Sequence, residues 1–223
     1  MPFAGGLSET ANGTLLFAVL LAVFYGFMAG HPPSWRRTLA KAGGVLLLAL
    51  LAAVQGGPAL LVAALLLSAA GDAFLAQNGE RAFMAGLASF LLAHLAYVAL
   101  FALSGEGVGL IVAEPWRIAL GLAMLASVGL LVGLLWPALP GAMRGPVALY
   151  AAAILAMGLG ALTVPVAPVV GGAVLFMASD GLLATGRFLI PPASPHHGWA
   201  QPAVWALYFS AQAMITLGVL LSF

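Results

Sequence analysis

The chain has 223 residues, of which 64% are hydrophobic and only 6% charged, and its mean hydropathy is +1.15. A soluble domain could not cover that much apolar surface, so the chain is expected to lie in a membrane. A net charge of +1 argues against nucleic acid as a partner, because binding it needs a concentrated basic face. With no cysteine, disulfides and thiolate metal sites are excluded.

Glycine, proline and charged residues divide the chain into eight long apolar segments. Each can cross the hydrocarbon core as a helix, and none alternates like a barrel strand. The predicted fold class is therefore all-α: a polytopic membrane protein, a bundle of about eight transmembrane helices in a single transmembrane domain, 1–223. The segments lie near 14–30, 38–54, 58–77, 82–104, 116–136, 145–163, 168–187 and 201–222.

Basic residues gather at one set of alternate helix ends. By the positive-inside rule, this set faces the cytoplasm and both termini face away from it. The chain is expected to be a multi-pass integral membrane protein, located in the cytoplasmic (inner) membrane if the source is bacterial. Arg117 and three glutamates fall at the opposite ends, whereas the basic set comprises Arg36, Arg37, Lys41, Arg81, Arg144 and Arg187.

Two apolar runs each contain one aspartate. They are "LLLSAAGDAFLA", with Asp72, and "LFMASDGLLA", with Asp180. A charged group inside a membrane helix costs ~3 kcal/mol on insertion scales and marks a functional site by default. The structural alternative is a buried ion pair, for example between Asp72 and Lys41, but buried pairs stabilise poorly compared with apolar packing.

The depth of the polar residues supports a shared site. At 1.5 Å per residue, Asp72 lies roughly 7 Å and Asp180 about 10 Å below the basic helix ends. Tyr150 and Tyr208 fall at similar depths, which scattered structural residues would have no reason to share. Deeper polar side chains have interhelical hydrogen bonding as the simpler explanation; they are His94 and Gln212.

The two aspartate segments also resemble each other. "SAAGDAFLA" (68–76) and "FMASDGLLA" (176–184) lie on helices that run in the same direction, and the helices that follow carry "AHLAY" and "AQAMI" at comparable offsets. These matches suggest a parallel internal repeat of three or four helices.

Several motifs, taken together and in order, resemble the lysoplasmalogenase (YhhN-like) family of integral membrane proteins. The resemblance runs from the third to the eighth helix; on the second helix the family pattern places Lys before Pro, whereas Lys41 precedes Ala42 here. It implies hydrolysis of the vinyl ether bond of lysoplasmalogens to a fatty aldehyde and glycerophosphocholine or glycerophosphoethanolamine. The motifs are "GDAFL", "FMAGLASFLLAHLAY", "GPVALY", "GAVLFMASDGLLA" and "YFSAQAMI".

Residue by residue, the resemblance implies that Asp72 and Asp180 are the catalytic pair. The expected partners are a lysophospholipid substrate and membrane lipid, with no cofactor and no metal; the oligomeric state is left open. The resemblance further implies a substrate pocket lined by Lys41, His94, Tyr97, Tyr150, Tyr208 and Gln212.

Two carboxyl groups suit this chemistry. One would protonate the β-carbon of the enol ether and the other would stabilise the oxocarbenium ion and activate water, as in glycoside hydrolysis. The sequence leaves the assignment open, with a slight preference for Asp72 as the acid because fewer polar residues flank it. The alternative function is a small proton-coupled transporter that uses the same two carboxylates.

Overall fold

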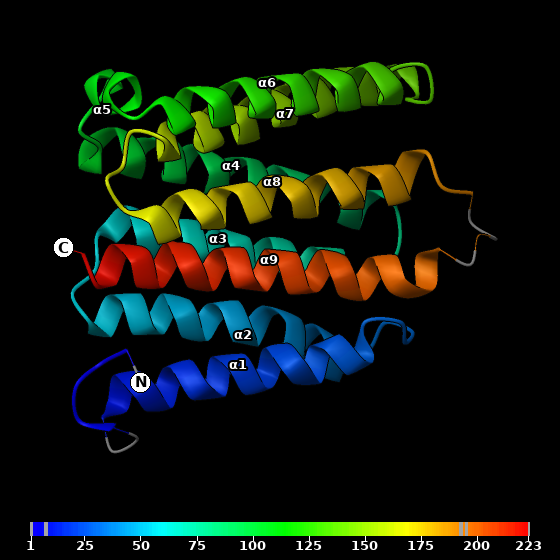
Figure 1. Cartoon of the computed structure of the whole chain (residues 1–223). Helices are drawn as coiled ribbons and strands as arrows, with labels where there is room; N and C mark the ends of the chain where they lie inside the picture. Colours follow the sequence, from blue (N-terminus) through cyan, green and yellow to red (C-terminus); the bar gives the residue numbers. More distant parts are fainter. Residues whose placement is uncertain (1, 7–8, 192–193, 195, 223) are drawn as a thin grey trace.

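The structure, a computed structural model, describes residues 2–6, 9–191, 194 and 196–222, and helices make up most of this part of the chain (Figure 1). No strand occurs among these residues, which confirms the all-α class. The helices are α1 (Thr10–Met28), α2 (Trp35–Val54), α3 (Ala59–Leu75), α4 (Glu80–Ser104), α5 (Val108–Ala113), α6 (Pro115–Leu135), α7 (Gly141–Ala161), α8 (Ala167–Phe188) and α9 (His197–Leu220).

The eight expected segments all form helices. Seven of them are long and apolar enough to cross a membrane, and α3, with 17 residues, is slightly shorter. The expected loop 105–115 is interrupted by α5, a six-residue helix without a buried residue, which the sequence analysis missed. The expected loop between the last two segments lies partly outside the described residues.

Four helices, α1, α2, α7 and α9, begin three or four residues earlier than expected, and in the last two a proline lies near the start. The sequence placed each of these two starts just before a proline, but Pro146 lies inside α7 and Pro202 inside α9, each at the sixth position of its helix. A proline at the sixth position leaves unmade only one hydrogen bond, the one to the carbonyl of the second helical residue, so a helix can begin a turn before it. Proline therefore marks these starts only to within a turn.

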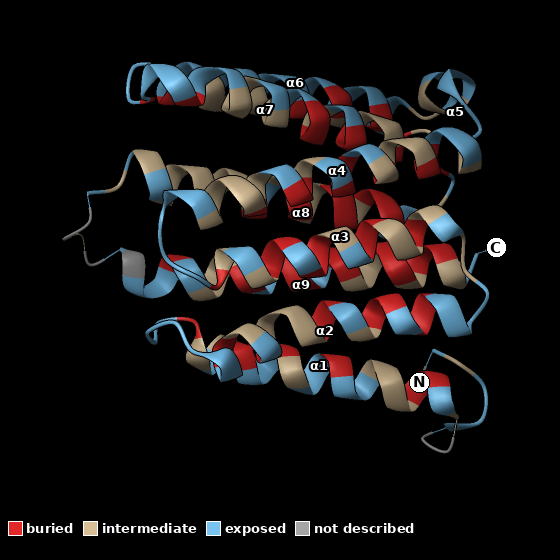
Figure 2. Ribbon diagram, turned by 180° about the vertical axis from the view of Figure 1, so that it is seen from behind, coloured by how far each residue is buried: buried red, intermediate tan, exposed pale blue. Residues whose placement is uncertain are grey.

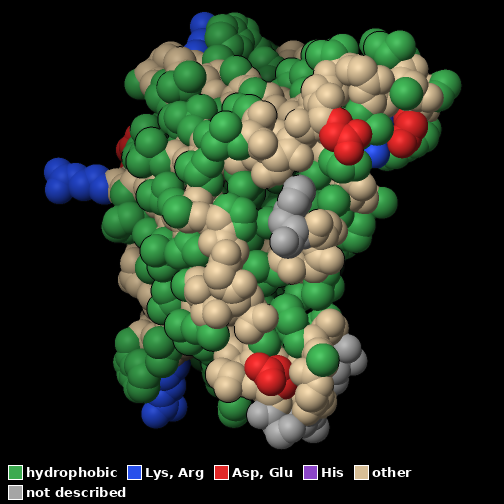
Figure 3. All heavy atoms as spheres, turned by 90° about the vertical axis from the view of Figure 1, so that its left-hand side faces the viewer, with side chains coloured by type: hydrophobic (Ala, Val, Ile, Leu, Met, Phe, Trp, Pro, Cys, Tyr) green, Lys and Arg blue, Asp and Glu red, His purple; other side chains and the backbone are tan. Residues whose placement is uncertain are grey.

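The helices lie side by side and alternate in direction, so the two termini lie at one end of the bundle (Figure 1). We call the other end, where α2, α4, α7 and α9 begin, the basic end, because the six basic residues predicted to share one side lie there. Viewed from the end with the termini, the surface is mostly hydrophobic with a few acidic side chains (Figure 3). The large exposed apolar surface is what a lipid environment requires.

Buried residues face the centre of the bundle, where α3, α4, α8 and α9 lie (Figure 2). Glycine allows close packing within two pairs of these helices: a Cβ on Gly71 of α3 would lie 2.6 Å from Phe90 of α4, and one on Gly172 of α8 would lie 2.9 Å from the carbonyl oxygen of Ala211 of α9. Small residues at helix crossings are typical of membrane bundles. These crossings bring the two aspartate helices against their following helices.

The helix pairing is the one expected from a duplicated four-helix unit. In each half, the third helix packs on the fourth (α3 on α4, α8 on α9), and the halves meet where α2 packs on α9 and α4 on α7. The first helices, α1 and α6, lie at opposite outer sides (Figure 1). This arrangement places the C-terminal parts of α3 and α8 at the basic end, where both border the same space.

Candidate active site

A cavity of about 770 Å³ lies at the basic end, and both aspartates line it. Its wall includes the ends of α3 and α8, the first turns of α4 and α9, and the loops beside them. A cavity of this size is in the range of small-molecule sites. The lone carboxyl groups of the two apolar runs therefore face one space that reaches the polar boundary of the bundle.

Asp72 is buried, with 1% of its side chain exposed, and makes two polar contacts. Its Oδ1 lies 3.4 Å from Nζ of Lys41 on α2, and its Oδ2 accepts a hydrogen bond of 2.8 Å from the Tyr208 hydroxyl on α9. Nζ of Lys41 also lies 5.7 Å from the centre of the Tyr25 ring on α1. Asp72 is thus held by a cation and a phenol from two different helices.

Asp180 has different partners. The Tyr150 hydroxyl on α7 donates a hydrogen bond of 2.5 Å to its Oδ2, and Nε2 of His94 on α4 lies 3.9 Å from the same oxygen. The His94 ring packs edge-on against Tyr150 and Phe176, which fixes its position. In the described part of the chain no lysine or arginine forms an ion pair with Asp180. The charge environments of the two aspartates therefore differ.

Three of the expected pocket residues lie behind the cavity wall. His94, Tyr97 and Gln212 are fully buried and do not line the cavity, in contrast to Lys41 and Tyr208. The Tyr97 hydroxyl donates a 2.5 Å hydrogen bond to Oε1 of Gln212, one turn from Tyr208 on α9. These three residues are placed to position the tyrosines and the carboxyl groups rather than to touch a ligand in the cavity.

Two basic residues outside the expected pocket set also line the cavity. Arg187, in the last turn of α8, lines the cavity, but the sequence analysis counted it only as a marker of orientation. Arg37 also reaches the cavity, yet its guanidinium group is engaged by the carbonyl oxygen of Ala76, at 2.8 Å, and by Ala29 and Tyr25. Arg37 stands one turn before Lys41 on α2, so the spacing in the sequence already places these two near each other, whereas the position of Arg187 on the same cavity could not be read from it.

A metal site needs a cluster of ligand side chains around one point. Among the described residues, no three His, Asp or Glu side chains come together closely enough to hold an ion. The titratable side chains that line the cavity carry carboxyl, phenol, ammonium and guanidinium groups, which suit proton transfer and the binding of an anionic group.

The fold and the cavity define a class: polytopic helical membrane proteins with a pair of carboxyl groups facing one intramembrane cavity. Within this class, residues 36–219 match the YhhN family, so the chain belongs to that family. This result confirms the resemblance seen in the sequence motifs.

Several relatives carry the name lysoplasmalogenase. The one from Mycobacterium bovis is 39% identical over 160 residues, which is 69% of this chain but only 58% of that protein, so the chain matches less than two thirds of the relative's length. Lysoplasmalogenase TMEM86B of Sus scrofa is 38% identical over 209 residues, 91% of this chain and 84% of the relative. Lysoplasmalogenase TMEM86A of Homo sapiens is 28% identical over 94% of this chain and 89% of its own. No solved structure is significantly similar to the chain.

Proposed function

We propose that this protein hydrolyses the vinyl ether bond of lysoplasmalogens and releases a fatty aldehyde and the glycerophospho head group. The observation that carries the proposal is that Asp72 and Asp180 line one cavity at the basic end while keeping different partners. The names of the relatives support the same activity. The transporter alternative would need a passage to the opposite end of the bundle, whereas the cavity residues come from the basic end.

The partners suggest which carboxyl group gives the proton. The ammonium group of Lys41 would balance a negative charge on Asp72, so Asp72 is assigned as the ionised group that activates water. Asp180, which has a phenol but no lysine or arginine as an ionic partner among the described residues, is assigned as the acid. This assignment reverses the slight preference drawn from the sequence.

The proposed reaction balances over one cycle. Asp180 gives its proton to the β-carbon of the enol ether, which becomes an oxocarbenium ion. Water attacks the carbon that bears the oxygen, and Asp72 takes the proton of that water. The hemiacetal then collapses: Asp72 returns a proton to the glycerol oxygen while Asp180 takes the hemiacetal hydroxyl proton, which restores both groups.

Basic side chains around the mouth of the cavity would hold the head group. Lys41 and Arg187 line the cavity from α2 and α8, and a phosphate between them would meet positive charge from both sides. The sn-1 bond of a lysolipid bound in this way lies several ångströms below the phosphate, which matches the depth of the aspartates, Asp72 in the last turn of α3 and Asp180 about two turns before the end of α8.

The test is aldehyde release from a defined lysoplasmenyl lipid by purified protein in detergent. General acid–base catalysis contributes about 10²- to 10⁴-fold, so Asp72→Asn and Asp180→Asn are each expected to lose at least about 100-fold of the rate. In D₂O, protonation at carbon should place deuterium beside the aldehyde carbon; an aldehyde incubated without enzyme controls for exchange.

The outcomes separate the activity from its mechanism. Aldehyde that persists in both folded Asn variants would overturn the carboxylate mechanism but leave the activity. No aldehyde from folded parent protein would overturn the vinyl ether hydrolase itself.

A further inference from the structure

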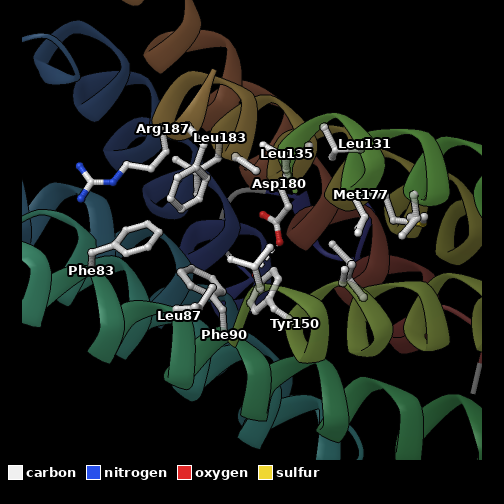
Figure 4. A pocket seen from close by; sticks show the side chains of 18 of the residues that line it. Phe83, Leu87, Phe90, Leu131, Leu135, Tyr150, Met177, Asp180, Leu183 and Arg187 are labelled. Carbon is white, nitrogen blue, oxygen red and sulfur yellow. Dashed lines mark hydrogen bonds between the residues drawn. The ribbon is translucent and has the colours of Figure 1, made fainter. Parts of the chain in front are cut away.

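A second hollow adjoins the cavity, a narrow groove of about 90 Å³ bounded mainly by α4, α6, α7 and α8. Its lining is almost entirely apolar; the polar side chains in it are Tyr150, Asp180 and Arg187. Figure 4 shows the Asp180 carboxyl group in the middle of this groove, pointing toward Tyr150. The groove thus presents a hydrocarbon surface to a single reactive carboxyl group.

The groove and the cavity share one wall, and Asp180 is part of it. Phe83, Phe90, Leu183 and Arg187 are also common to both hollows. Asp72, in contrast, lines the cavity but not the groove. A polar cavity, a carboxyl group and a narrow apolar groove therefore follow one another in space.

A lysoplasmalogen has the same order of parts: a charged head group, a vinyl ether and one hydrocarbon chain. We propose that the groove binds the part of the alkenyl chain next to the vinyl ether, so that Asp180 faces the β-carbon on the chain side and Asp72 the glycerol side. This inference rests on the proposed function. The position of the groove also supports Asp180 as the acid. The β-carbon that takes the proton is part of the alkenyl chain, and Asp180 is the aspartate that lines the groove.

The groove is expected to orient the chain more than to supply affinity. A chain that leaves the bilayer for the groove exchanges one apolar surrounding for another, so little hydrophobic free energy is gained. The groove would instead raise the rate by holding the β-carbon against the Asp180 carboxyl group, because a misplacement of 1 Å can lower a rate by about 10²-fold.

The length of the groove indicates how much of the chain it takes. On α6 it extends from Val128 to Leu135, about 10 Å at 1.5 Å per residue. The rest of a long chain would therefore lie in the surrounding lipid. Helix α6 suits this exit, since it has the smallest buried share of the seven spanning helices in the described part of the chain.

Photo-crosslinking tests occupancy without relying on catalysis. The probe is an alkyl ether lysophosphatidylcholine, which has no vinyl ether to cleave, with a diazirine on the chain close to the ether. Neighbouring leucines on α6 provide a sharp readout, because Leu131 and Leu135 line the groove while Leu130 and Leu134 are exposed on the outer face. Label on the groove leucines that unlabelled lysolipid displaces is expected; label on the outer leucines alone would overturn the proposal.

A matched pair of variants tests the effect on rate. Ala151 of α7 lines the groove, whereas Ala152 next to it is exposed and lines neither hollow. We expect Ala151→Leu to lower aldehyde release on the order of tenfold to 100-fold and to displace the crosslink, and Ala152→Leu to do neither. Should Ala151→Leu not fold, Ala184→Leu in the groove and Ala178→Leu on the exposed side of α8 form a second pair.

The result separates this inference from the proposed function. Parent protein that releases aldehyde but crosslinks only outside the groove, or an Ala151→Leu protein with the parent's rate, would overturn the groove alone. Parent protein that crosslinks in the groove but releases no aldehyde would overturn the vinyl ether activity and leave a site for lysolipid chains.

Discussion

Lys41 is the residue that distinguishes the two carboxyl groups, because its ammonium group lies 3.4 Å from Asp72. Removing one partner of a buried ion pair leaves an uncompensated charge and costs about 3–5 kcal/mol, whereas removing both can be neutral. Lys41 keeps 14% of its side chain exposed, so the lower value applies.

We therefore expect Lys41→Met to destabilise the protein by ~3 kcal/mol and to remove aldehyde release. The double variant Lys41→Met, Asp72→Asn should regain most of the stability and none of the activity. Thermal unfolding in detergent, with aldehyde release measured on the same samples, tests both statements. A stable and active Lys41→Met protein would show that the lysine is not needed to balance Asp72.

At the scale of residues, the sequence predicted which polar side chains lie near the cavity, but not the direction in which each side chain points from its helix. Lone carboxyl groups in apolar runs are conspicuous, and helix depth correctly placed Tyr150 and Tyr208 at the level of the aspartates, to which they donate hydrogen bonds. Depth along a helix says nothing of direction around it. For this reason the sequence could not place His94 behind the wall or Arg187 on it.

At the scale of elements, Arg117 connects α6 with the segment after α7 at the end opposite the candidate active site. It is 3% exposed, and its Nη1 donates to the carbonyl oxygens of Leu162 and Val164, just after α7, while its Nε binds Glu114 at the start of α6. The hydrogen bond from Arg117 holds the pKa of Glu114 below its ordinary value. A depressed pKa contributes stability that is present above the ordinary carboxyl pKa and is lost as the pH falls through the lower value.

Arg117→Met should lower the stability by about 2 kcal/mol, because two carbonyl groups lose their donor. Arg36→Met is the matched control: Arg36 is exposed at the start of α2, and its loss should change the stability by less than about 0.5 kcal/mol. Aldehyde release should be unchanged in Arg117→Met, which lies far from the cavity. Equal thermal midpoints for the two variants would contradict this structural role.

Helices were more predictable than the segments between them. Eight apolar runs became eight long helices because lipid leaves the backbone no other local solution. In contrast, the short α5 and the early starts of α7 and α9 lie at the bundle ends, where water is also available to the backbone. The packing of α4 on α7, which connects the halves, has no signal in one sequence.

For the whole molecule, the distribution of basic residues predicts that the basic end faces the cytoplasm. The chain has no cysteine, so single cysteines can report the side directly. In bacterial spheroplasts, a membrane-impermeant maleimide should label Glu106→Cys at once and Asn78→Cys only after permeabilisation, since the two positions are exposed at opposite ends. The reverse pattern would place the active site on the outer side.

The contacts of the aspartates cross between the two halves of the chain. Asp72, before α5, accepts a hydrogen bond from Tyr208 after it, and Asp180, after α5, lies beside His94 before it. Each half supplies one carboxyl group and one of its partners, Lys41 for Asp72 and Tyr150 for Asp180. The other partner of each aspartate comes from the other half. A duplicated four-helix unit would account for this pattern: each copy contributes one carboxyl group, and the copies differ in the neighbour that each supplies from its own half, a lysine for Asp72 and a tyrosine for Asp180.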